Sequence, residues 1–180
     1  MGFILDTNLT KESFNDYVTG KKGFIGSLFI DGTKLSFKYD SEKVTILANS
    51  QGLITFAKIL IDYAWDEHQK YGDHIHLYPS DNISLEDLDP DSNEVLVKKE
   101  NFDYHLLKNT GVKKDIADSF CGERLAICCC KKKVIIQGKS LTLLNCAKEL
   151  IEYAFCADQR YFQITYVDNN YMRVYIMRQL

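Results

Sequence analysis

The sequence of 180 residues lacks several features that identify whole classes of protein. No run of apolar residues is long enough to span a bilayer, and the chain does not open with the charged, apolar and small segments of a secretory leader. The Met1-Gly2 start is followed at position 6 by Asp6, where N-myristoylation requires serine or threonine. We therefore expect a soluble, cytoplasmic protein that does not bind membranes.

The sequence also lacks the short motifs of common catalytic and nucleic-acid-binding sites. It contains no nucleophile elbow, no Walker A loop, no dinucleotide glycine fingerprint and no His-Glu-x-x-His helix. The net charge is −3, and the longest basic run is the triplet at 131–133. These absences leave an enzymatic role unsupported without excluding it, give no indication of a cofactor, and disfavour the binding of nucleic acid.

The six cysteines include no Cys-x-x-Cys pair, which disfavours a zinc ribbon or a thioredoxin-type motif. Three of them, at 128–130, are consecutive and would alternate between the two faces of a strand, so they cannot easily serve one metal. We expect reduced cysteines that fill the core.

What the sequence does contain is an internal repeat. Residues 44–71 align without a gap with residues 134–161, at an offset of 90, and 12 of the 28 aligned residues are identical. In each copy a β-branched run predicts a strand, and a serine, Ser50 or Ser140, then follows as the expected N-cap. Leucine and alanine recur after each serine at spacings of three and four residues, which predicts an amphipathic helix.

Further strands surround this shared segment and complete a β-β-α-β-β unit in each copy. We predict them at 34–38, 74–78, 94–98, 124–128, 163–167 and 173–177. An extra strand is expected at 23–30, and further helices at 10–17 and 102–120. The predicted fold is α+β, with antiparallel or mixed sheets, a long helix packed on each sheet, and two units, 1–100 and 101–180, about a pseudo-twofold axis. Whether the two sheets join into one is left open.

Two histidines lie at alternate positions of the strand expected at 74–78. His74 and His76 would face the same side, at a spacing that chelates zinc or copper when a third ligand is near. The second copy has Gln163 and Thr165 at the positions that we take as equivalent, so no second metal site is predicted. The alternative interpretation is a polar strand face with hydrogen-bonded imidazoles.

An acidic loop without any basic residue follows, at 81–94. An EF-hand loop starting at its third acid would need glycine and glutamate where Ser92 and Lys98 stand, so calcium binding is disfavoured. The loop is either a solvated surface or a negative surface that meets a positively charged partner. The candidate partner-binding residues are Asp81, Glu86, Asp87, Asp89, Asp91 and Glu94.

Residues 43–100 resemble the immunity protein 32 family, small bacterial proteins encoded beside polymorphic toxins. The resemblance rests on a glycine-leucine helix start at 52–53, an alanine-containing amphipathic helix ending near Trp65, and a strand with the pattern Asp-His-x-His-Leu-x-Pro. The residues of this strand motif are Asp73, His74, His76 and Pro79. On this resemblance, the second half of the chain would be a diverged duplicate of the first half, without the histidine pair and the proline.

The resemblance implies a non-enzymatic protein that binds a cognate toxin and neutralises it by occlusion. Many such toxins are basic nucleases, whose positive clefts the acidic loop would fill. Two alternatives remain open from the residues. One is a metal-dependent enzyme or metal-binding module built on His74 and His76, and the other is a structural subunit that forms a homodimer through a strand edge.

Overall fold

The computed structural model describes the chain at residues 32–40, 43–66, 74–79, 88–99, 125–130, 133–156, 161–164 and 173–178. Within these residues the protein is α+β, with two helices and two four-stranded mixed sheets. The helices are α2 (Ser50–Trp65) and α4 (Ser140–Phe155). Neither helix is long and apolar enough to cross a membrane. The additional elements expected at 10–17, 23–30 and 102–120 lie outside the described residues.

The two sheets are built on the same plan. Sheet 1 has the order β1 (Leu35–Asp40), β2 (Lys43–Ala48), β8 (Arg173–Arg178) and β7 (Tyr161–Ile164). Sheet 2 has the order β3 (His74–Leu77), β4 (Glu94–Lys99), β6 (Lys133–Gly138) and β5 (Ala126–Cys130). In each sheet the two central strands are parallel, and each outer strand is antiparallel to its neighbour.

Each sheet therefore combines one antiparallel pair from the first half of the chain with one from the second half. The registers of the two sheets also correspond: Lys43 of β2 pairs with Arg173 of β8, and Lys133 of β6 pairs with Glu94 of β4. Lys43 and Lys133 are separated by 90 positions, which is the offset at which residues 44–71 align with residues 134–161. The pseudo-twofold axis and the division into units 1–100 and 101–180 stay predictions.

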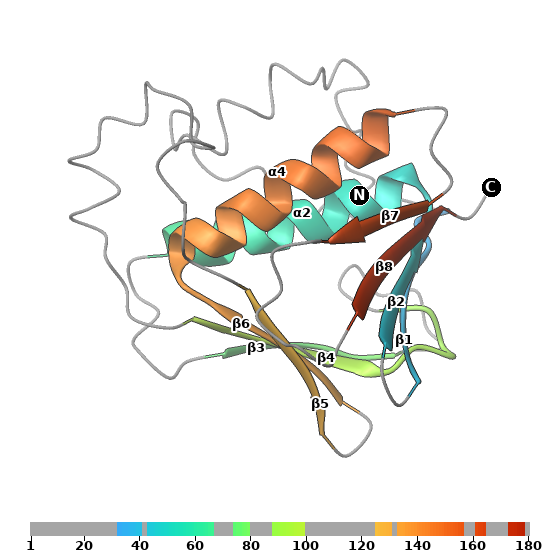
Figure 1. Cartoon of the computed structure of the whole chain (residues 1–180), viewed down its shortest axis with the longest axis horizontal. Helices are drawn as coiled ribbons and strands as arrows, with labels where there is room; N and C mark the ends of the chain where they lie inside the picture. Colours follow the sequence, from blue (N-terminus) through green and yellow to red (C-terminus); the bar gives the residue numbers. More distant parts are fainter. Residues whose placement is uncertain are drawn as a thin grey trace, which may run out of the picture.

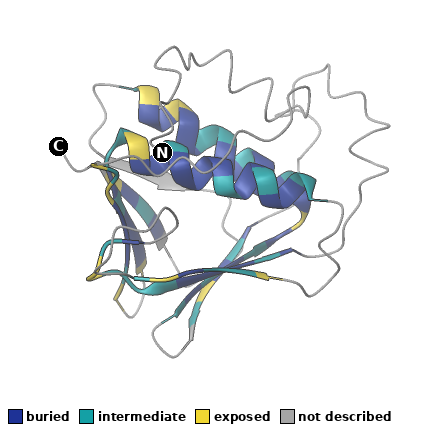
Figure 2. Ribbon diagram, turned by 180° about the vertical axis from the view of Figure 1, so that it is seen from behind, coloured by how far each residue is buried: buried dark blue, intermediate teal, exposed yellow. Residues whose placement is uncertain are grey.

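The two sheets lie at an angle to each other, and the helices lie side by side across the open side between them, running in opposite directions (Figure 1). Buried residues follow the helices and the middle strands of both sheets (Figure 2). They form one hydrophobic core, to which both helices and both sheets contribute. An edge-to-face contact between Phe37 of β1 and Phe56 of α2, with ring centroids 5.1 Å apart, ties sheet 1 to the first helix.

Two expectations at element boundaries are wrong. Ser50 and Ser140 are the first residues of their helices instead of the N-caps, which are Asn49 and Lys139. The strand expected at 163–167 begins at Tyr161 and is described to residue 164. The other seven predicted strands of the two repeat units are confirmed, within two residues at each described end.

Candidate functional site

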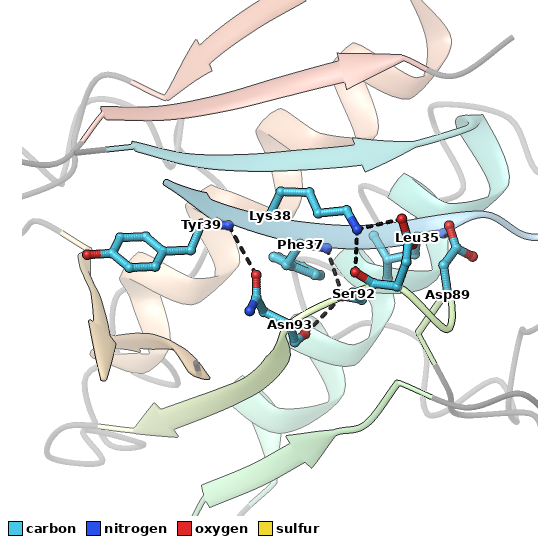
Figure 3. A network of polar contacts seen from close by, with 8 residues as sticks. Leu35, Phe37, Lys38, Tyr39, Asp89, Ser92 and Asn93 are labelled. Atoms are coloured by element: carbon cyan, nitrogen blue, oxygen red, sulfur yellow. Dashed lines mark hydrogen bonds and ion pairs between the residues drawn. The ribbon is translucent and has the colours of Figure 1, made fainter. Parts of the chain in front are cut away.

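The last part of the predicted acidic loop, residues 88–93, runs along the edge of β1 that β2 does not cover (Figure 3). We call this segment the strap. The Asp89 backbone N–H donates to the Leu35 carbonyl over 2.9 Å, and the Leu35 N–H donates to Asp89 Oδ1 over 3.3 Å. The Asp89 carboxylate thus accepts the hydrogen bond that the carbonyl of a neighbouring strand would otherwise accept from Leu35.

The same arrangement continues along β1 with uncharged side chains (Figure 3). The Phe37 N–H donates to Ser92 Oγ over 2.8 Å, and the Phe37 carbonyl accepts from the Asn93 N–H, also over 2.8 Å. The Tyr39 N–H donates to Asn93 Oδ1 over 3.1 Å. An exposed strand edge is a template for unwanted pairing, so the strap protects sheet 1 and joins it directly to β4 of sheet 2.

Asp91 has a different place in the strap. Its carboxylate forms an ion pair with the Lys38 ammonium, and Lys38 also donates to the Asp91 carbonyl. The Asp91 side chain is 74% exposed, so solvent screens the pair and its contribution to stability is small. Of the three predicted acids that are described, Asp91 is the one most open to a partner.

The two ends of the loop before the strap are held together. Pro79 and Leu88 form a parallel β-bridge, and the Leu88 N–H donates to the Tyr78 carbonyl over 2.8 Å. Leu88 is 2% exposed and belongs to the core, which anchors the returning chain. Three of the predicted partner-binding acids, Asp81, Glu86 and Asp87, and the motif residue Asp73 lie outside the described residues.

The two motif histidines and Tyr78 place three aromatic rings in a row, which we call the ring row. The His74 and His76 rings meet edge to face with centroids 4.8 Å apart, and the His76 and Tyr78 rings stack 5.3 Å apart with 5° between their planes. The alternate residues Ile75 and Leu77 contact the core. The row therefore lies on the face of sheet 2 that points away from the helices.

A carboxylate holds the middle of this row. Glu94 Oε1 lies 2.7 Å from His76 Nδ1 and accepts a hydrogen bond from Lys133 Nζ over 2.8 Å. Burial alone would raise the pKa of the Glu94 carboxyl, but the hydrogen bonds from Lys133 and His76 outweigh burial and hold this pKa below its ordinary value. In turn, the hydrogen bond to Glu94 raises the pKa of the Lys133 ammonium. For His76, the interpretation as a hydrogen-bonded imidazole on a polar strand face is confirmed.

The structure bears on the metal alternative and on the second copy. Over the described ranges, no three His, Cys, Asp or Glu side chains lie close enough together to hold a metal ion. The strand registers make Tyr161 the counterpart of His74 and Gln163 the counterpart of His76. The expected counterparts, Gln163 for His74 and Thr165 for His76, are therefore wrong by two residues.

The described cysteines differ in their surroundings. Cys146 is buried in the core, as expected, whereas Cys128 is exposed on β5, so the expectation of a core role is wrong for Cys128. Burial, with a smaller contribution from Cys128, raises the pKa of the Cys129 thiol to about 11. At neutral pH Cys129 is therefore protonated and a poor nucleophile.

The strap was not foreseen from the sequence. Its turn-forming composition, Asp-Pro-Asp-Ser-Asn at 89–93, was a usable signal, because Asp, Ser and Asn side chains often bond to nearby backbone groups. That signal does not show that the backbone in question belongs to a strand more than 50 residues earlier. Two of the candidate partner-binding acids, Asp89 and Glu94, also make contacts within the chain.

Comparison with known proteins gives one finding. The sequence model of the immunity protein 32 family matches residues 43–100, about a third of the chain. This segment contains β2, α2, β3, the ring row, the strap and β4. The chain matches no curated protein and no solved structure. The predicted resemblance is confirmed over these residues.

Proposed function

We propose that this protein is an immunity protein, which binds a cognate bacterial toxin in the cytoplasm and neutralises it by occlusion. The observation that carries this proposal is the immunity protein 32 match over residues 43–100. The matched segment supplies every described residue of the candidate site except Lys133 and the β1 residues that the strap contacts. A stable occluding complex is expected to bury about 1,200–2,000 Å² of total surface.

The polar groups of the site support binding without catalysis. The Glu94 carboxylate is shared between His76 and Lys133, and Asp89 is engaged by the β1 backbone. A catalytic acid, base or nucleophile instead needs a proton or lone pair directed at a substrate. We therefore assign these residues to holding the surface in shape.

The acidic loop supports a positively charged toxin surface as the partner, such as the phosphate-binding cleft of a nuclease. We propose that Asp81, Glu86, Asp87 and Asp91 meet the toxin directly. Asp89 and Glu94, the other two candidate residues, position the loop from its C-terminal end through their contacts with β1, His76 and Lys133.

The test is expression of the neighbouring upstream reading frame in a bacterial host. We expect this gene to stop growth when expressed alone, and co-expression of the present protein to restore growth. Purified proteins should then form a complex whose dissociation constant rises with salt, because charges contribute to the contact. A neighbouring gene that is harmless, or toxicity that co-expression does not relieve, would contradict the proposal.

Elemental analysis of the purified protein separates the proposal from the metal alternative. We expect no stoichiometric zinc or copper. A stoichiometric metal that disappears in the His74→Ala, His76→Ala double variant would favour a metal-binding module instead.

A homodimer formed through a strand edge stays a prediction, which light scattering would test. The strap occupies the outer edge of β1, so such a dimer would have to use another strand.

A further inference from the structure

Sheet 2 has one face that no described helix or strand covers. Val95, Val134 and Ile127, one from each of β4, β6 and β5, belong to the core, so their neighbours along each strand point to the opposite side. Both helices and sheet 1 lie on the core side of sheet 2 (Figure 1). We call the opposite side the outer face. The strand registers place its residues in three rows across the strands: His74, Lys98, Gln137 and Ala126 in the first, His76, Leu96, Ile135 and Cys128 in the middle, and Glu94 and Lys133 in the third.

The middle row of the outer face is mainly apolar. Leu96 is 8% exposed, Ile135 is half-buried and Cys128 is exposed. An apolar centre with polar groups around it is the usual arrangement of a protein-binding surface. The corresponding positions of sheet 1 differ, because Tyr175 stands in place of Leu96 and Thr45 in place of Ile135. The apolar middle row is therefore specific to sheet 2.

The first and third rows carry two ammonium groups and one carboxylate. The carboxylate is Glu94, which is already shared by His76 and Lys133 and has a side chain only 17% exposed. The Lys133 side chain is 42% exposed, and one of its three N–H donors is used by Glu94. Lys98 makes no side-chain hydrogen bond or ion pair over the described ranges. The outer face therefore offers unused donors and positive charge, while its carboxylate is taken.

We infer that the outer face of sheet 2 binds an acidic surface of the toxin, with a carboxylate at Lys98, another at Lys133 and apolar side chains against the middle row. This inference rests on the proposed function. It adds a second contact, of opposite charge, to the one proposed for the acidic loop. Lys98 pairs with Gln137, four residues along β6 from Lys133, so the two lysine backbones are about 14 Å apart. The two carboxylates therefore belong to separate positions on the toxin surface.

Other occupants match these groups less well. A second copy of the chain would bring the same unused ammonium groups and no free carboxylate from its own outer face, and like charges across an interface are unfavourable. A nucleic acid presents a continuous line of phosphates, whereas this face has two ammonium groups separated by an apolar row. An acidic protein surface with an apolar centre satisfies both the charges and the middle row.

The experiment measures binding of full-chain variants to the toxin encoded upstream, by titration calorimetry at several salt concentrations. Lys98→Glu should weaken binding by about tenfold or more, because it places like charges together, and Lys98→Arg should stay within about twofold. The loss in Lys98→Glu should shrink as salt is raised. Ile135→Thr installs the residue of the first copy and should weaken binding by about threefold.

A matched control is available on sheet 1. Met177 of β8 occupies the position that Lys98 occupies in sheet 2, and its side chain is 45% exposed. Met177→Glu adds the same carboxylate to the other sheet and should leave toxin affinity unchanged. Urea unfolding checks that each variant is folded. If Lys98→Glu is unstable, Lys98→Gln, which only removes the charge, should weaken binding by about threefold.

The outcomes separate this inference from the proposed function. If the wild-type protein fails to protect cells, the proposed function is wrong. If it protects cells but Lys98→Glu and Ile135→Thr bind the toxin as tightly as wild type, only the present inference is wrong. Equal losses in Lys98→Glu and Met177→Glu would also overturn it, because the effect would then come from net charge.

Two further measurements test the other occupants. Light scattering detects a dimer, and a labelled single-stranded RNA of twelve nucleotides detects binding of nucleic acid. We expect neither a dimer that Lys98→Glu disrupts nor RNA binding that Lys98→Glu abolishes. Either result, together with unchanged toxin affinity in Lys98→Glu, would assign the outer face to that other occupant and overturn the inference.

Discussion

The two helices are equally long and lie 90 residues apart, yet they begin in different ways. At α2 the Asn49 side chain accepts a hydrogen bond from the Gly52 N–H over 2.9 Å, accepts another from the Lys34 N–H and donates to the Gly32 carbonyl. At α4 the equivalent Lys139 makes no side-chain cap bond. The first helix is therefore fastened to the chain before β1 by its cap side chain, whereas the second helix begins without a side-chain cap bond.

The first turns also place their small residues differently. A Cβ atom at Gly52 would lie 1.9 Å from the Lys34 carbonyl oxygen and 3.3 Å from the Ala48 Cβ. In the second copy the helix position is Thr142 and the strand position is Gly138, where an added Cβ would lie 3.3 Å from the Thr142 Cβ. Each copy thus keeps one glycine at the junction of strand and helix, on opposite sides. The strand and helix keep the same register in both copies. The glycine that allows their close contact lies on the helix in the first copy, as Gly52, and on the strand in the second, as Gly138.

The largest expected effect comes from removing the glycine of the first copy. Gly52→Ala would gain about 1 kcal/mol of helix propensity, but the overlap with the Lys34 carbonyl forces backbone movement that costs about 3 kcal/mol or more. We expect a net loss of about 2 kcal/mol or more in the free energy of unfolding, measured in urea. Thr142→Ala at the equivalent position is the control and should change stability little. Equal effects at the two positions would contradict the comparison.

The next effect concerns the caps. Asn49→Ala removes the cap bond and both contacts to the chain before β1, and should cost about 1–2 kcal/mol. Lys139→Asn supplies the missing cap to α4 and should add about 0.5–1 kcal/mol. Thermal unfolding of the two variants checks both signs. If Lys139→Asn lowers the melting temperature, the cap is not what distinguishes the two helices.

A third prediction concerns the strap. Ser92→Ala leaves the buried Phe37 N–H without its acceptor and should cost about 1 kcal/mol. Asp91→Asn breaks only an exposed ion pair and should cost about 0.5 kcal/mol or less. At the offset of 79 that relates β4 to β8, the second copy has Tyr171 in place of Ser92. Urea unfolding of both variants, with light scattering to detect association through β1, measures the difference.

The smallest effect concerns the parallel pair in each sheet. Glu94 pairs with Lys133 in sheet 2, whereas the equivalent pair in sheet 1 is Arg173 with Lys43, two positive charges. Arg173→Glu would put an acidic residue at the register position opposite Lys43 and should stabilise the protein by about 0.2–1 kcal/mol at low salt. The gain should disappear in high salt, and a loss of stability at low salt would contradict this account.

Glu94 itself gives sheet 2 a pH dependence. Its pKa in the folded protein is below the value of 4.5 for the free side chain, so its ionised form is favoured by folding. This contribution is complete above pH 4.5 and is lost as the pH falls through the lower folded pKa. Glu94→Gln should flatten the dependence of the urea midpoint on pH in that acidic range. An unchanged pH profile would show that the contact with His76 and Lys133 does not persist in solution.

The sequence was enough to predict most of the fold, because the repeat supplied each periodic pattern twice. Strand and helix patterns depend on neighbouring residues, and both helices and seven of the strands agree with the structure. The way in which the halves share two sheets was not predictable, since parallel pairing of β2 with β8 leaves no local signal. For the site, the histidine pair was visible in the sequence, but the contacts that Glu94 makes with His76 and Lys133 were not predictable from it. A charge pattern alone does not distinguish an acid that meets a partner from one that meets its own chain.

The pairing of β2 with β8 also has a consequence for how the protein is made. Lys43 and its register partner Arg173 are 130 positions apart, so sheet 1 rests on contacts of very high sequence separation. Folds dominated by such contacts acquire their structure slowly. During synthesis β2 has only β1 as a neighbour in the sheet until β8 has been translated, and its other edge stays open to incorrect association for that time. Sheet 1 is therefore complete only once β8 is in place.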